Sequence, residues 1–81
     1  MSQEKENEYS TKDLSEAGAL IINGLKMVRI DRQESVCFFI FDNKTGCEKI
    51  ANQFLFGKLK ANLREYYEIL TILKRKIFNN S

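Results

Sequence analysis

The amino-acid sequence predicts one small α+β domain, a β-hairpin packed by three helices in the order α-β-β-α-α. The spacing of apolar residues changes twice along the chain. It is helical from Leu14 to Leu25, strand-like from 27 to 41, and helical again after residue 47. With 81 residues the chain has room for one domain. We expect residues 1–8 to be a disordered N-terminal tail and residues 9–81 to form the domain.

The first helix carries local signals at both of its ends. Ser10 is a suitable N-cap, and Asp13 follows in the first turn, near the positive end of the helix dipole. Tyr9 and Leu14 have the spacing of a hydrophobic staple. Gly24 is suited to a left-handed C-cap, so we expect the helix to end there.

A hairpin is expected next. Met27–Ile30 reads as a half-buried strand, and Asp31–Ser35 is polar enough to form the turn. The run Val36–Phe41 is rich in β-branched and aromatic residues and predicts the strongest strand of the chain. This strand should lie at the centre of the fold.

Two further helices follow the hairpin. The second is expected from Cys47 to about Phe56, with Thr45 or Asn43 as its cap. The last should begin at Leu63, where Asn62 is a suitable N-cap.

The strand Val36–Phe41 is apolar on both faces, which is unusual for a hairpin that packs one face on a core and turns the other to water. Either helices of the same chain cover both faces, or a second chain does so by extending or covering the sheet. Candidate residues for such self-association are Val36, Phe38, Phe39, Ile40 and Phe41.

Residues that carry catalysis or bind metals are scarce. The chain has no histidine and two cysteines, Cys37 and Cys47, too few ligands for a structural zinc site. Without a histidine neither thiol has the usual activating base, so we interpret both as reduced structural thiols. No glycine-rich phosphate loop occurs. We therefore expect no enzyme activity, no cofactor, no catalytic or metal site and no small-molecule substrate.

Charge is unevenly distributed along the chain. The net charge is +2, but residues 44–81 hold eight bases and three acids. A basic half suggests contact with a nucleic-acid backbone, with Tyr66 or Tyr67 as a stacking ring. The alternative is an ordinary lysine-rich surface. The candidate contact residues are Lys58, Lys60, Arg64, Lys74, Arg75 and Lys76.

The sequence also bears on location. The first residues are polar and acidic, unlike a signal peptide, and the longest apolar run is far shorter than a membrane span. We therefore expect a cytoplasmic protein that does not enter a membrane.

Several segments together have a familiar order. They are Tyr9-Ser-Thr-Lys-Asp-Leu14, the helix end Leu20–Gly24, the strand Val36–Phe41 and the last helix from Ala61 to Phe78. In this order they resemble a family of small prokaryotic and phage proteins known only as a domain of unknown function. The resemblance covers roughly residues 9–79. The family pattern has a proline near Leu63, whereas this chain has none. The resemblance implies association with phages or other mobile elements and supplies no catalytic residues.

The expected function is a non-enzymatic binding or assembly module whose partner is a protein, either a second copy or another chain. A homodimer would form through the hairpin. The rival interpretations are a small nucleic-acid-associated protein that uses its basic C-terminal half, and an inhibitor that blocks a host or competing system.

Overall fold

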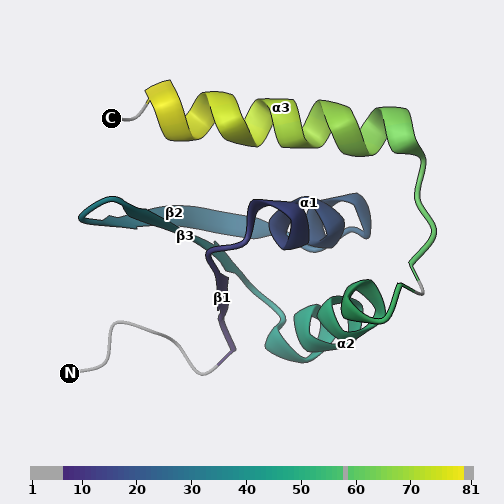
Figure 1. Cartoon of the computed structure of the whole chain (residues 1–81). Helices are drawn as coiled ribbons and strands as arrows, with labels where there is room; N and C mark the ends of the chain where they lie inside the picture. The colour runs from purple at the N-terminus through teal and green to yellow at the C-terminus, as the bar shows by residue number, and fades with distance from the viewer. Residues whose placement is uncertain (1–6, 58, 80–81) are drawn as a thin grey trace.

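The computed structural model describes residues 7–57 and 59–79 and confirms the α+β class (Figure 1). The elements are β1 (Tyr9–Thr11), α1 (Leu14–Ile22), β2 (Met27–Gln33), β3 (Val36–Phe41), α2 (Lys44–Leu55) and α3 (Leu63–Asn79). The predicted hairpin and helices are present, and a strand that was not predicted precedes them. In Figure 1, α1 lies between α2 and α3 and contacts both.

The segment before α1 is a strand and not the start of the helix. Tyr9–Thr11 pairs with β3, so Ser10 is not an N-cap. Asp13 caps α1 instead, because its Oδ1 accepts the backbone N–H groups of Ser15 (2.9 Å) and Glu16 (3.3 Å). Pairing with a buried apolar strand satisfies more backbone groups than a cap at Ser10 would, so the local signal was overridden.

Two residues of the expected tail are bound to the domain. The backbone carbonyl of Asn7 accepts the N–H of Lys44 at 3.0 Å, and the carboxylate of Glu8 forms an ion pair with Arg29 at 2.9 Å. Residues 1–6 lie outside the described residues. The ordered chain therefore begins before residue 9.

The strands form an antiparallel sheet in the order β1-β3-β2, with β3 in the centre. Strand β2 is longer than predicted, because residues 31–33 pair with residues 36–38 of β3. The turn is therefore Glu34-Ser35 alone, and not Asp31–Ser35. Glu34 takes a φ of 56°, in the left-handed region that a two-residue hairpin requires.

The chain itself covers both faces of the inner half of β3. Phe39 and Phe41 face the helices and are 1% and 0% exposed. On the opposite face Ile40 is 3% exposed, and its partner in the register is Arg29. Because paired residues share a face, the Glu8–Arg29 ion pair lies across this side of the sheet. On this face of β3 we had expected a helix or a second chain, and an ion-pair network lies there instead.

The helices begin and end at polar residues and glycines. Gly24 has a φ of +88°, and the N–H of Leu25 bonds to the carbonyl of Leu20, a Schellman motif that confirms the predicted end of α1. The side chain of Asn43 accepts the N–H of Gly46, so α2 begins at Lys44, before the predicted Cys47. The side chain of Asn62 accepts the N–H of Glu65 at 3.1 Å and caps α3 as predicted.

Candidate functional site

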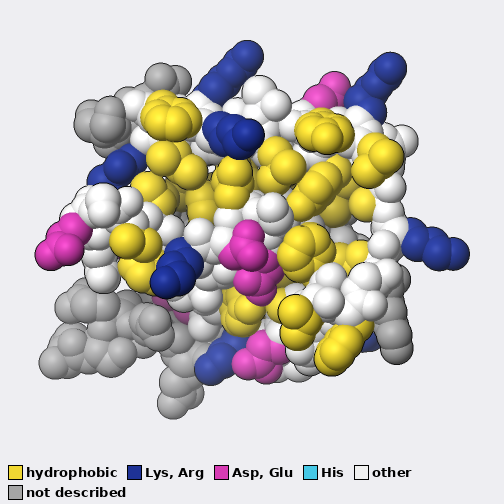
Figure 2. All heavy atoms as spheres, in the orientation of Figure 1, with side chains coloured by type: hydrophobic (Ala, Val, Ile, Leu, Met, Phe, Trp, Pro, Cys, Tyr) yellow, Lys and Arg dark blue, Asp and Glu magenta, His cyan; other side chains and the backbone are white. Residues whose placement is uncertain are grey.

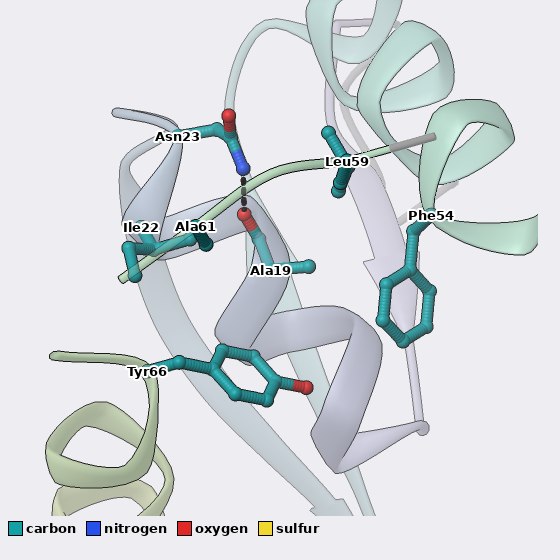
Figure 3. Close-up of a pocket in the computed structure, with 7 residues that line it drawn as sticks. All are labelled: Ala19, Ile22, Asn23, Phe54, Leu59, Ala61 and Tyr66. Carbon is teal, nitrogen blue, oxygen red and sulfur yellow. Dashed lines mark hydrogen bonds between the residues drawn. The ribbon is translucent and has the colours of Figure 1, made fainter. Parts of the chain in front are cut away.

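A small apolar pocket opens where α1, α2 and the start of α3 meet (Figure 3). Its volume is about 150 Å³. Figure 3 shows the rings of Phe54 and Tyr66 flanking Ala19. The lining residues are Ala19 and Ile22 of α1, Asn23 at the end of α1, Phe54 of α2, Leu59 and Ala61 of the connector, and Tyr66 of α3.

Close packing of α1 on α3 positions one wall of the pocket. Gly18 of α1 is buried, and a Cβ atom built on it would lie 2.8 Å from Leu70 Cδ2 and 3.1 Å from Tyr66 Cε1. The missing side chain therefore lets α3 approach α1. Tyr66 is held in place because its hydroxyl donates to the carbonyl of Ser15 at 2.9 Å.

Two polar groups that line the pocket are paired within the chain. The Asn23 Nδ2 donates to the carbonyl of Ala19 at 2.7 Å (Figure 3), and the Tyr66 hydroxyl is bonded to Ser15. The pocket thus presents mainly aliphatic and aromatic carbon. An open hollow of about 150 Å³ with such a lining is large enough for a benzene-sized apolar group.

Exposed apolar residues adjoin the pocket in the chain. Leu55 and Phe56 follow the pocket residue Phe54 and are 74% and 70% exposed. Leu63, between Ala61 and Tyr66, is 72% exposed. Figure 2 shows hydrophobic side chains over α2 and along α3. We call the pocket together with Leu55, Phe56 and Leu63 the apolar end of the domain.

The basic residues suggested by the sequence do not form one patch. Lys60 and Arg64 are exposed and lie next to residues of the apolar end in the chain. Lys74–Lys76 begins ten residues after Arg64 on the same helix, about 15 Å away at 1.5 Å per residue. Lys58 lies outside the described residues.

The second basic group is itself divided. Arg75 lines a shallow hollow on the outer face of α3 together with Tyr67, Glu68, Thr71 and Ile72. Lys76 lies beside β2, where it lines a different hollow with Met27–Ile30. The bases thus face different sides of the domain.

The residues suggested for self-association also divide. Phe39, Ile40 and Phe41 are buried within the chain and present no side chain to a partner. Phe38 is half-buried, and Val36 is 38% exposed. Side-chain contact through β3 is therefore restricted to the end near the hairpin turn.

Cys47 and its neighbours have a structural arrangement. The Cys47 thiol is fully buried and donates to the carbonyl of Asp42 at 3.4 Å. Burial, followed by the nearby carboxylates of Asp42, Glu16 and Glu48, raises the pKa of this thiol to about 11. A thiol with such a pKa is protonated at neutral pH and is a poor nucleophile.

Glu16 connects α1 to β1. Its carboxylate accepts hydrogen bonds from the hydroxyls of Tyr9 and Thr11. Burial and the hydrogen bond to Glu16 raise the pKa of Tyr9. Among the described residues, no group of three or more His, Cys, Asp or Glu side chains is arranged to hold a metal. In the same part of the chain no helix is long and apolar enough to cross a membrane.

Comparison with known proteins gives one match. No curated protein and no solved structure matches the chain. A family model described as "Domain of unknown function (DUF5659)" matches residues 6–79, nearly the whole chain, which confirms the resemblance to a domain of unknown function. The chain belongs to this family, DUF5659.

Proposed function

We propose that the protein is a non-enzymatic binding module whose apolar end receives an apolar side chain of a protein partner. The observation that carries the proposal is the pocket itself, a benzene-sized hollow with a mainly apolar lining. Interfaces concentrate their binding energy in such pockets, where a buried anchor is surrounded by residues that exclude water. Leu55, Phe56 and Leu63, which are exposed and lie next to pocket residues in the chain, are the candidates for that surrounding ring.

The anchor is best a phenylalanine ring. The pocket volume of about 150 Å³ matches a benzene-sized group, and the rings of Phe54 and Tyr66 offer edge and face contacts to another ring. The Asn23 amide nitrogen and the Tyr66 hydroxyl at the pocket are both bonded within the chain. An apolar aromatic side chain therefore fits best.

The positive charge beside the pocket indicates which residues of the partner should flank its phenylalanine. The segment 59–66 carries the bases Lys60 and Arg64 against the single acid Glu65. Opposite charges across an interface raise the association rate and exclude wrong partners. The partner segment should thus carry Asp or Glu next to its phenylalanine.

A selection from random linear peptides displayed against the full-length chain tests this proposal. We expect the enriched peptides to share a phenylalanine flanked by Asp or Glu. Ala61→Phe, which fills the pocket from the connector, should weaken a selected peptide roughly thirtyfold, the loss of one anchor worth about 2 kcal/mol. The double variant Lys60→Glu and Arg64→Glu should also weaken peptide binding, and the loss of affinity should be larger at low salt than at high salt.

Ile72→Phe is the matched control, because it adds an aromatic ring at a site on α3 that is 51% exposed and outside the pocket. It should leave the peptide affinity unchanged. Enrichment of no peptide, or equal effects of Ala61→Phe and Ile72→Phe, would contradict the proposal. Tight oligonucleotide binding that Ala61→Phe does not change would favour the nucleic-acid interpretation instead.

A further inference from the structure

Strand β2 is an edge strand with one side of its backbone free. It pairs with β3, and among the described residues no other strand pairs with it. Its sequence, Met-Val-Arg-Ile-Asp-Arg-Gln, contains neither the proline nor the lysine that commonly protects an edge. A bulge between Met27 and Arg29 leaves residues 29–33 regularly paired. The hollows along β2 are lined by its own residues and Lys76.

The hairpin determines which residues of β2 offer their backbone to a partner. Gln33 and Val36 flank a two-residue turn and close the ladder as a hydrogen-bonded pair. Along β2, residues whose N–H and C=O groups bond to β3 alternate with residues whose N–H and C=O groups point away from β3, toward the free edge. Ile30 and Arg32 are therefore the residues whose backbone groups face the free edge.

Only a few antiparallel registers pair these outward groups with those of a second β2. In the register centred on Ile30, Arg29 stands opposite Asp31 of the partner subunit, and the bulge at 27–29 lies opposite residues 31–33. In a register centred on Arg29, the two Arg29 side chains would lie opposite each other. In a register centred on Asp31, the two Asp31 side chains would do so. Like charges directly opposite are destabilising, whereas opposite charges stabilise the pair. Charge thus selects the register centred on Ile30.

The geometry favours close contact of these charges. Ile30 opposite its own copy is a hydrogen-bonded pair, so the flanking Arg29–Asp31 pairs are non-hydrogen-bonded pairs, in which side chains lie nearer each other. The side chains of Arg29 and Asp31 are 37% and 42% exposed. Within the chain Arg29 Nε already bonds Asp31 Oδ1 at 3.1 Å, so the charges of a second chain would join a cluster of Glu8, Arg29 and Asp31 that each subunit contains.

We propose that two copies of the chain form a two-fold dimer by antiparallel pairing of their β2 edges, in the register centred on Ile30. The two three-stranded sheets join into one sheet of six strands. The contact between Arg29 of one subunit and Asp31 of the other occurs twice, because a two-fold interface uses the same surface of both subunits. This dimer does not depend on the apolar end, which belongs to other elements.

Sedimentation equilibrium of the full-length chain tests the dimer. The wild-type mass should rise from 9.5 kDa to twice that value as the concentration increases. Asp31→Arg and Arg29→Asp, each alone, place like charges opposite each other at two positions and should weaken the dimer roughly tenfold or more. An equal mixture of the two variants restores opposite charges at both positions and should dimerise as a heterodimer.

The mixture also separates loss of contact from loss of folding, since an unfolded variant could not restore the dimer. Circular dichroism of each variant provides the second check. Glu68→Arg changes the charge by the same amount as Asp31→Arg but lies on the outer face of α3, so it should leave the dimer intact. A wild-type mass of 9.5 kDa at all concentrations, or a mixture that stays monomeric, would overturn the proposal. Neither result would affect peptide binding at the apolar end.

Discussion

Replacing Phe41 with alanine is expected to lower the free energy of unfolding by about 3–5 kcal/mol. Phe41 is fully buried, and it pairs with Tyr9 of β1 on one side and Met27 of β2 on the other. The truncation leaves a cavity where all three strands meet. A domain of 81 residues is typically stable by about 4–12 kcal/mol. The variant should therefore be close to the limit of folding.

Urea unfolding followed by circular dichroism measures this loss. Phe56→Ala is the matched control, because it removes the same atoms from a residue that is 70% exposed. Its effect should stay within about 0.5 kcal/mol. Equal losses for Phe41→Ala and Phe56→Ala would show that β3 is not the centre of the core.

Leu73→Ala should cost about 2–5 kcal/mol, because Leu73 is 1% exposed and brings α3 into the core. Near the ends of the helix, the hydroxyl of Tyr66 bonds to Ser15, and Arg32 donates to the carbonyl of Ile77 at 2.6 Å. These polar contacts lie at exposed positions and cannot replace the apolar contact in the middle.

Ile72→Ala is the control for this variant, since the neighbouring side chain is 51% exposed on the same helix. Urea unfolding of the two variants should give a large loss for Leu73→Ala and a small one for Ile72→Ala. If α3 were only loosely attached, Leu73→Ala would leave the main transition unchanged and would speed amide hydrogen exchange in α3 alone. That result would contradict the docking of α3 seen in Figure 1.

The parts of the fold that were predicted correctly have strong local signals. The strand Val36–Phe41 has the predicted bounds, because an uninterrupted run of β-branched and aromatic residues is a strong strand signal. Gly24 ends α1 as predicted, since glycine readily adopts a positive φ. Asn62 caps α3 as predicted through its own side chain. Each signal depends on a few neighbouring residues.

The errors arose where distant pairing decides the structure. Strand β1 has three residues, which are too few to show a periodic pattern in the sequence. It forms because its backbone pairs with residues 39–41 of β3. Because Ser10 lies in β1, it is not the N-cap of α1 that its local sequence suggested. The polar residues 31–33 read as a turn, yet they continue β2 because their partners in β3 hold them. Side-chain polarity did not reveal this backbone pairing.

The pocket of the apolar end could be predicted only in part. Tyr66 was singled out from the sequence as a possible stacking ring, but the hollow needs α1, α2, the connector and α3 to converge. Sequence spacing does not give that convergence. The basic residues show the opposite error: Lys60 and Arg64 were grouped with Lys74–Lys76 by composition, although the length of α3 separates them.

The central claim is that the apolar end binds a benzene-sized apolar group, and toluene titrated into the ¹⁵N-labelled chain tests it most directly. In two-dimensional NMR spectra the backbone amides of the pocket residues, such as Ala19, Phe54 and Ala61, should shift together with increasing toluene. The same titration of Ala61→Phe should leave them unshifted. Toluene shifts at Tyr67 and Ile72 on the outer face of α3, with none at the pocket, would contradict the claim.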